Sequence, residues 1–290
     1  MIVRRTFLSG TALVAAGLVL NPKLARASSP AAPRLTATIG GRRVDRDEVL
    51  QWEARRLKVA AARIKGNVTG WLLGDLDALI LRPALSTADV PRAREQLADV
   101  KMRLGEAEMR KLTTVDLDAS NPLGVITAAP HQWAISHTTI QSDAGTADGF
   151  VNWFNHRIAL NDVRSMLVAC PDHYISRTTG PKRVEVIEET GGAIVASRFF
   201  INLAETDSLP IPVDPKYPAR TAGWARNAHG TRIGAVRHQF RNDPDGGFTG
   251  ELAVAFPAFV PPTFITEHRW HMACEFSNWI TAYVTPSRHA

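Results

Sequence analysis

The sequence predicts an α+β protein in which an antiparallel sheet wraps around a long C-terminal helix, with a helical lobe on the N-terminal side. Three observations support this class. Helical spacing dominates before residue 113, and short runs rich in β-branched residues separated by turn signals follow Pro130. The chain then ends in a helical run over 263–284 that is preceded by two prolines. Strands joined by hairpins and closed by one helix are typical of α+β domains.

Two segments of the N-terminal half have helical periodicity. The first runs from Asp45 to about Lys65, and the second covers 92–112 and follows several potential cap residues. Residues 28–42 are rich in Ser, Pro, Ala and Gly, which predicts a linker. We therefore assign residues 28–128 to a linker and a helical lobe, with a packing or substrate-covering role and no titratable cluster beyond surface charge.

Residues 129–290 are predicted to form one domain built on the sheet. A short helix around 148–156 interrupts its strands. The segments predicted as strands are 133–140, 164–169, 183–189, 193–203, 233–240 and 250–256.

Length and composition indicate a globular chain. It has 290 residues, of which 45% are hydrophobic and 21% charged, and these are ordinary values for globular domains. A mean hydropathy of -0.10 and a single long apolar run exclude a polytopic membrane protein. Two cysteines, Cys170 and Cys274, are too few for a disulfide framework or a cysteine-only zinc site, and their spacing leaves open whether they pair.

The formal net charge of +6 comes largely from the first residues. Residues 1–27 carry four basic side chains and no acidic one, so the rest of the chain carries +6 − 4 = +2. The remaining basic residues are interspersed with acidic ones. Nucleic-acid binding is not expected, because it requires a clustered basic surface.

The N-terminus has the three parts of an export signal. A basic 4-RRTFLSG-10 precedes the apolar run Thr11–Leu20, and 25-ARA-27 offers a cleavage site. The adjacent arginines followed by Phe-Leu resemble a bacterial twin-arginine signal. We expect residues 1–27 to engage the twin-arginine export machinery and be removed, which predicts a periplasmic or secreted protein. The apolar run is shorter than the roughly 20 residues that a stable span needs, although a retained N-terminal anchor is the alternative.

The last predicted helix carries a polar face. His268, His271 and Glu275 share that face, and His271 and Glu275 lie one turn apart. Such a pair can bind one metal ion, because zinc accepts imidazole nitrogen and carboxylate oxygen. The alternative is an exposed polar stripe without a ligand.

A carboxylate also interrupts an apolar strand face. Period-two alternation places Glu188 on the same face as Val184 and Val186. A buried carboxylate among apolar side chains requires a cation. His173 and His238 lie on neighbouring segments and are further candidates to complete a site.

Four short blocks of the second half resemble the 2,4-diacetylphloroglucinol hydrolase family. These blocks are 163-VRSMLVACPDHY-174, 184-VEVIEETGG-192, 237-RHQFRNDPDGG-247 and the helix pair His271 and Glu275. The resemblance implies a Bet v 1-like helix-grip fold and a zinc ion held by two histidines and two glutamates. On the matching positions, it implies that His173, Glu188, His271 and Glu275 are the ligands and that His238 is the catalytic histidine, which transfers protons.

The family's pattern is not complete in this chain. Ser165 stands where the family has a substrate-binding tyrosine, and Ser176 stands in place of an asparagine. The resemblance implies a zinc-dependent hydrolase that cleaves the carbon–carbon bond between an acyl carbonyl and an aromatic or enolic carbon, in an acylphloroglucinol-like aromatic ketone. The N-terminal signal adds the expectation that this hydrolase is exported, which differs from a cytoplasmic catabolic enzyme. The alternative is a non-catalytic small-molecule carrier with a Bet v 1-like apolar cavity. Homo-oligomerisation stays open.

Overall fold

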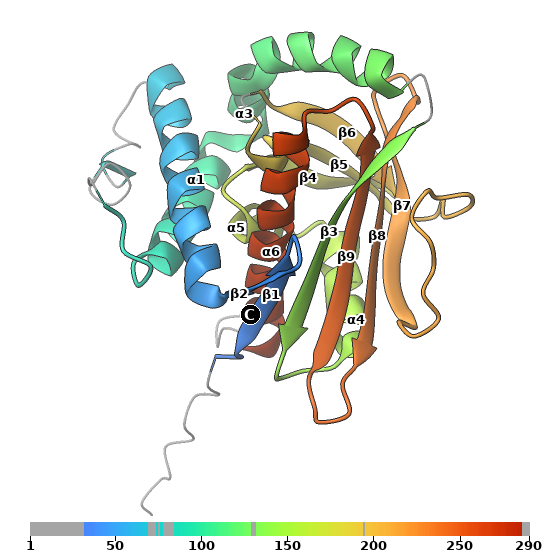
Figure 1. Cartoon of the computed structure of the whole chain (residues 1–290). Helices are drawn as coiled ribbons and strands as arrows, with labels where there is room; N and C mark the ends of the chain where they lie inside the picture. Colours follow the sequence, from blue (N-terminus) through green and yellow to red (C-terminus); the bar gives the residue numbers. More distant parts are fainter. Residues whose placement is uncertain are drawn as a thin grey trace, which may run out of the picture. The chain divides into compact units, whose positions relative to one another are not determined.

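The fold is built on an open antiparallel sheet, which has nine strands within the described residues. The computed structural model describes residues 32–68, 74, 76–77, 84–128, 132–193 and 195–285. The predicted export signal at 1–27 lies outside them. The sheet order is β2-β1-β3-β9-β8-β7-β6-β5-β4 (Figure 1). The strands are β1 (Leu35–Ile39), β2 (Arg42–Asp45), β3 (Trp133–Ser142), β4 (His173–Gly180), β5 (Arg183–Glu188), β6 (Ser197–Asn202), β7 (Ala219–Arg226), β8 (Arg232–Asn242) and β9 (Phe248–Pro257).

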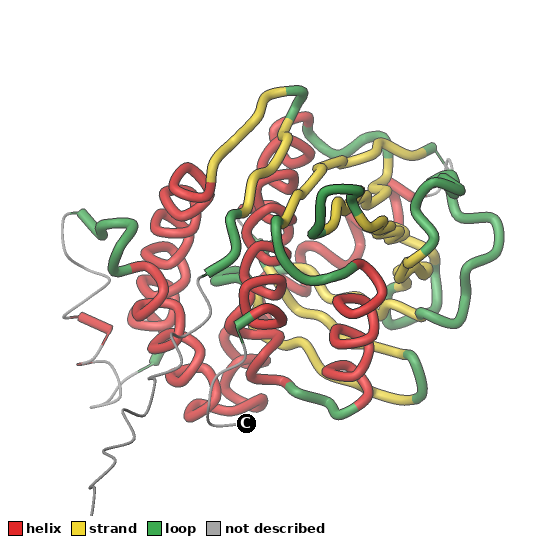
Figure 2. The backbone as a smooth tube through the Cα atoms, turned by 90° about the horizontal axis from the view of Figure 1, so that it is seen from below, coloured by secondary structure: helices red, strands yellow, loops and turns green. Residues whose placement is uncertain are grey.

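Helices lie against both faces of the sheet, and Figure 2 shows them from below, in red beside and among the yellow strands. They are α1 (Arg46–Asn67), α3 (Val90–Ala128), α4 (Ala147–Ala159), α5 (Val163–Ala169) and α6 (Pro262–Val284), with the 3₁₀ turn η2 (Thr190–Gly192). The α3 segment is two helices joined at Gly105, whose φ of 76° breaks the helical path. No helix of the described chain combines the length and the apolar character needed to cross a bilayer.

An aromatic cluster joins α6 and α4 to the sheet. Phe150 of α4 lies 5.2–6.1 Å, between ring centroids, from Phe240 of β8, Phe248 of β9 and Phe276 of α6. Each of these four side chains is at most 1% exposed. Burying one such ring contributes about 1.5–3 kcal/mol, so this cluster positions α6 against the strands.

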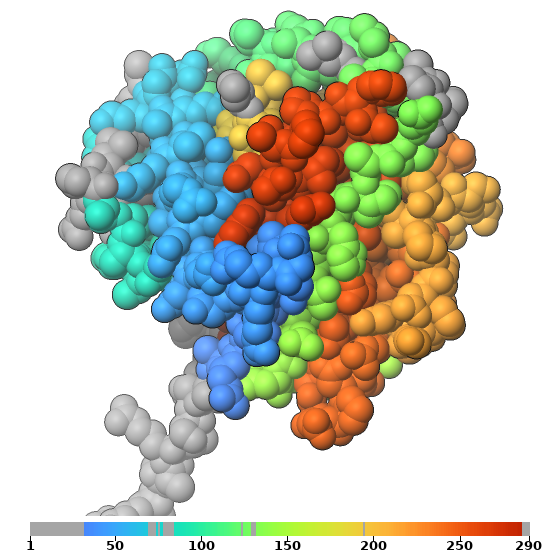
Figure 3. All heavy atoms as spheres, in the orientation of Figure 1, coloured from blue at the N-terminus to red at the C-terminus, as the bar shows by residue number. Residues whose placement is uncertain are grey.

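The prediction of a Bet v 1-like helix-grip fold with a separate helical lobe is wrong. The sheet is open, and its first two strands come from residues 35–45, within the segment predicted as linker and lobe. Figure 3 shows the β1–β2 hairpin beside α6 and β3, and β1 pairs with β3 along its whole length. The Gly40-Gly41 pair makes a two-residue hairpin loop, because both glycines have positive φ, 58° and 80°. The two glycines lie in the segment 28–42, whose Ser, Pro, Ala and Gly content predicts a linker, so the turn was not recognised.

The structure does contain the antiparallel sheet and the long last helix that the sequence predicts. The helices predicted at 45–65, 148–156 and 263–284 correspond to α1, α4 and α6. The predicted strand 164–169 is instead the helix α5, because Asp162 caps it by accepting a hydrogen bond from the backbone nitrogen of Ser165. The second predicted helix extends to Ala128, and β4 and β7 were not predicted as strands.

A buried carboxylate fastens α3 to the outer face of the sheet. Glu185 of β5 is fully buried and accepts hydrogen bonds from Arg110 of α3 at 2.7 Å, Arg177 of β4 at 2.9 Å and Arg198 of β6 at 2.7 Å. Burial alone would raise the pKa of Glu185, but the guanidinium groups, chiefly Arg110 and Arg198, lower it to about 2.

This depressed pKa predicts an acid-sensitive attachment. The stabilisation is complete above the ordinary pKa of 4.5 and is lost as the pH falls toward 2. We expect Glu185→Gln to lower the free energy of unfolding by roughly 2 kcal/mol at pH 7 and to flatten its decline between pH 5 and pH 2. Urea unfolding at a series of pH values measures both effects. Glu106→Gln, which removes an exposed partner of Arg110, is the control and should change little. An unchanged pH profile in Glu185→Gln would contradict the assignment.

Candidate metal centre

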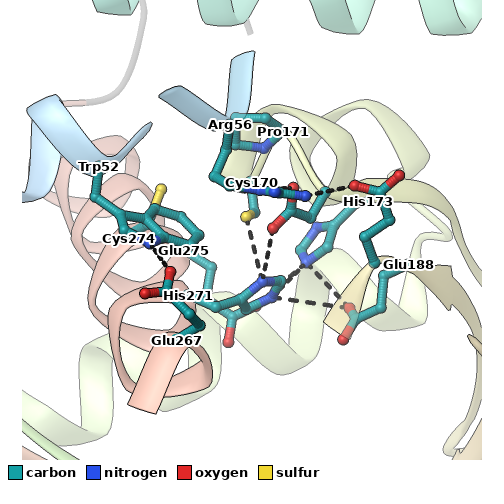
Figure 4. Close-up of polar contacts among 12 residues, drawn as sticks. Trp52, Arg56, Cys170, Pro171, His173, Glu188, Glu267, His271, Cys274 and Glu275 are labelled. Carbon is teal, nitrogen blue, oxygen red and sulfur yellow. Dashed lines mark hydrogen bonds and ion pairs between the residues drawn. The ribbon is translucent and has the colours of Figure 1, made fainter. Parts of the chain in front are cut away.

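Two imidazoles and two carboxylates converge between the last helix and the sheet (Figure 4). Nε2 of His173 lies 3.3 Å from Nε2 of His271, and 3.4 Å from Oε2 of both Glu188 and Glu275. Nε2 of His271 lies 3.8 Å from Oε2 of Glu188 and 3.7 Å from Oε2 of Glu275. The structure therefore brings all four predicted ligand residues together around one point.

Three elements position these side chains. His173 begins β4 and is paired in register with Glu188 at the end of β5, while His271 and Glu275 lie one turn apart on α6. The η2 turn that follows Glu188 packs directly on α6. Gly191 has a φ of +60°, and a Cβ there would lie 2.8–2.9 Å from Cβ, Cα and N of His268. Glycine at 191 thus allows the close approach that brings the strand ends to the helix.

A hydrogen bond orients His173, and an ion-pair contact with a buried carboxylate faces His271. Nδ1 of His173 lies 2.8 Å from the carbonyl oxygen of Met166, and since a carbonyl only accepts, Nδ1 carries the proton. Nδ1 of His271 faces Oδ2 of the buried Asp172 at 3.5 Å. In this arrangement the Nε2 lone pairs and the glutamate oxygens point to the same place, where only a cation or a proton satisfies them.

The separations are close to those around a small tetrahedral ion. Zinc bonds to histidine and carboxylate are about 2.0–2.2 Å long, so the edges of the ligand tetrahedron are about 3.3–3.6 Å. The three separations from His173 lie in this range, and the two from His271 to the glutamates, 3.8 and 3.7 Å, are slightly longer. The donor set and its spacing are therefore compatible with a divalent metal.

His271 holds a proton when no cation is bound. Burial alone would lower the pKa of His271, but Glu188, Asp172 and Glu275 together raise it to about 9. A metal ion has to displace this proton, so binding releases it and weakens as the pH falls.

Cys170 approaches the same histidine from its other side. Cys170, His173 and His271 form a buried group that could hold a metal ion. However, Sγ of Cys170 lies 3.6 Å from Nδ1 of His271, away from the nitrogen that faces the two glutamates. Burial and the neighbouring Cys274 raise the pKa of Cys170 well above its ordinary value, so it is a neutral thiol, and both cysteines are free. The Cys-x-x-His spacing to His173 is the sequence signal that would have pointed to it.

The N-terminal helices carry charged residues that support this centre, contrary to the expectation of surface charge alone. Arg56 of α1 donates to Oδ1 of Asp172 at 2.7 Å and also to Glu189. Lys101 of α3 is buried and donates to the carbonyl oxygens of Pro171 at 2.6 Å and His173 at 2.5 Å. The helices α1 and α3 thus hold the 171–173 turn, which carries Asp172 and His173. These contacts are between helices and a turn distant in sequence, so no local pattern indicates them.

A cavity of about 590 Å³ is lined by all four converging residues, His173, Glu188, His271 and Glu275. His238 of β8 lines it and is 8% exposed, with its ring edge against Phe276 at 4.7 Å between centroids. Its Nδ1 has no hydrogen-bond partner among the described residues. Burial lowers the pKa of His238 to about 4, although Glu275 opposes this. His238 is therefore neutral at pH 7.

Three other residues named in the sequence analysis lie outside the group of four donors. His268 also lines the cavity, but its Nδ1 lies 3.1 Å from Oγ of Ser136 and it stacks on His271 without joining the four donors. Ser165 donates its hydroxyl to Asp162, the cap residue of α5, at 2.7 Å, and it does not line the cavity in the described structure. Ser176 does line the cavity.

Comparison with protein-family models finds no matching family, and comparison with curated proteins finds no similar sequence. The chemistry of the site therefore has to be argued from its own residues.

The contacts behind His271 predict that Asp172 and Arg56 position it. We expect Asp172→Asn to weaken zinc binding by roughly 10- to 100-fold, because the carboxylate that orients the ring loses its charge. Arg56→Gln should have a smaller effect in the same direction, and Arg56→Lys should restore part of it. Competition with a chelator measures the affinity, and the visible spectrum of the cobalt-substituted protein reports the ligand geometry. Arg55→Gln, at an exposed position of the same helix, is the control. Unaltered affinity and spectrum in Asp172→Asn would show that Asp172 serves stability alone.

Proposed function

We propose that this protein is a metal-dependent hydrolase with zinc at the centre formed by His173, Glu188, His271 and Glu275. The observation that carries the proposal is the convergence of two imidazoles and two carboxylates in the lining of a large, mostly apolar cavity. A buried carboxylate beside a largely buried one is costly at such a place without a compensating cation.

The donor set favours zinc over the common hard cations. Calcium and magnesium prefer shells made of oxygen alone, whereas two of the four donors here are imidazole nitrogens. Zinc also accepts a four-coordinate site of this size.

The proposed reaction is cleavage of the carbon–carbon bond between an acyl carbonyl and an aromatic or enolic carbon. This reaction type is the one implied by the resemblance to the 2,4-diacetylphloroglucinol hydrolase family. Zinc, when bound, supplies a Lewis acid that polarises the carbonyl and lowers the pKa of water. One water is consumed, and the products are a carboxylic acid and the protonated leaving carbon.

His238 is suited to move the proton in this reaction. It is neutral at pH 7, so it accepts a proton from the attacking water and returns it to the leaving carbon. Its position in the wall of the cavity, within electrostatic reach of Glu275, supports this role. The proposal also keeps the export route expected from residues 1–27, so the enzyme would act in the periplasm or outside the cell.

A non-catalytic carrier is the second candidate, because the apolar cavity by itself suits storage of a small molecule. The two candidates differ in their need for the four donors. A carrier keeps its ligand when a donor residue is removed, whereas the proposed hydrolase loses its metal and its activity.

The metal centre predicts one zinc ion per chain in protein folded with zinc present. We expect Glu188→Gln and Glu275→Gln to lose stoichiometric zinc and turnover and to lower the melting temperature of the zinc-loaded protein, because each removes a charge that offsets the dication. Elemental analysis and thermal unfolding with and without zinc measure this.

Matched variants on the same helix are the controls for these changes. Glu267→Gln alters a carboxylate that accepts a hydrogen bond from Trp52, and His268→Gln alters an imidazole outside the four donors, so both should retain zinc. If the wild type binds no divalent metal at neutral pH, or if His268→Gln loses zinc while His271→Gln keeps it, the proposed centre is wrong.

The role of His238 predicts a separation of metal binding from turnover. We expect His238→Asn to keep one zinc ion per chain and to lose roughly 10²- to 10⁴-fold in kcat. Steady-state kinetics combined with elemental analysis tests this. Loss of zinc in this variant would make His238 a metal ligand, and unchanged kcat would remove it from the reaction.

A further inference from the structure

Away from the four donor residues, the described lining of the cavity carries no acidic or basic side chain other than histidine. Among the described residues that line it, the only acidic side chains are Glu188 and Glu275, and no lysine or arginine is present. The chain has 34 basic and 28 acidic residues, so this absence from a cavity of about 590 Å³ is a strong segregation of charge. The charged part of the cavity is confined to the metal centre.

Aromatic and branched aliphatic side chains make up half of the remaining lining. Phe199 and Ile201 of β6 and Phe256 of β9 lie on the strands, and Phe264 and Phe276 come from α6. The polar side chains on the strand side are uncharged at pH 7: the hydroxyls of Ser176, Thr190, Ser197 and Thr221, and His238.

The apolar wall continues to the surface. Phe259, in the connection between β9 and α6, lines the cavity and is 61% exposed. Apart from the four donors, the described residues of the lining offer no countercharge to a bound molecule. Transfer of an ionised group from water into such surroundings is strongly unfavourable without a partner.

We propose that the substrate is an uncharged, predominantly apolar ketone whose leaving carbon is enolic, such as a 1,3-diketone with apolar substituents. The inference rests on the proposed function for the reaction, while the polarity of the ligand rests on the cavity wall alone. Water adds to one carbonyl, and the bond to the central carbon breaks. The electron pair forms the enolate of the second ketone, which takes the proton. The products are a carboxylic acid and a ketone, and no oxidant or reductant is needed.

A matched pair of probes tests the polarity. The neutral probe is 1-phenylbutane-1,3-dione, and the charged probe is the same molecule with a carboxylate at the para position of the ring. We expect the neutral probe to bind at least tenfold more tightly at pH 7, by isothermal titration calorimetry with the full chain. The titration is done on metal-free and zinc-loaded protein, because zinc would itself attract a carboxylate. Equal or tighter binding of the charged probe in both forms would overturn the inference.

A cation placed in the wall should reverse the preference. In Ile201→Lys, the new ammonium group lies in the cavity wall, so we expect tighter binding of the carboxylate probe and weaker binding of the neutral one. Val213→Lys adds the same charge at an exposed position and should change neither affinity. If Ile201→Lys folds and leaves both affinities unchanged, the cavity is not the binding site. If it does not fold, the wild-type comparison decides.

Turnover of the same probes separates this inference from the proposed function. Tight binding of the neutral diketone without release of acid by zinc-loaded protein would refute the hydrolase and leave the polarity of the ligand standing. Zinc-dependent hydrolysis of 2,4,6-trihydroxyacetophenone in preference to the neutral diketone would refute the apolar substrate and leave the hydrolase standing.

Discussion

Burial of two glutamates beside two histidines at the junction of α6 with the strand ends is the constraint on which this structure depends. Glu188 is buried and the Glu275 side chain is 13% exposed, so two like charges lie close together in a largely buried site. Such an arrangement is costly unless a cation compensates it. In the protein alone, the raised pKa of His271 supplies a proton for that purpose. A divalent metal would compensate the same negative charges with twice the positive charge, and it would contact all four side chains.

The N-terminal helices α1 and α3 support the chain segment that leads into this group of side chains. A second layer of buried charges surrounds the 171–173 turn, with Arg56 on Asp172 and Lys101 on the carbonyl oxygens of Pro171 and His173. The same helices also cover the outer face of β5 through Arg110 and Glu185. The helices α1 and α3 therefore contact both the sheet and the candidate metal centre, and the second half of α3 lines the cavity. Changes in the packing of these helices are expected to affect the cavity and the candidate centre together.

Several parts of the fold could be predicted because their signals are local. The periodicity of α6 placed His271 and Glu275 on one face, and alternation along β5 placed Glu188 with Val184 and Val186, which all line the cavity. Other parts could not. The apolar run of α5 is too short to distinguish a helix from a strand, and the β1–β2 hairpin lay in a composition typical of linkers.

The sequence by itself placed His271 with Glu275 on one helix face and Glu188 among apolar neighbours on one strand face, because these spacings follow from local periodicity alone. It also determined the long last helix, through its length and its proline start. The tertiary structure decided which groups meet. Cys170 faces Nδ1 of His271 while the glutamates face Nε2, and Arg56 reaches Asp172 across 116 positions of the chain. The open sheet and the uncharged cavity wall were likewise settled by the packing of distant segments, because burial and register are collective properties of strands that no single segment encodes.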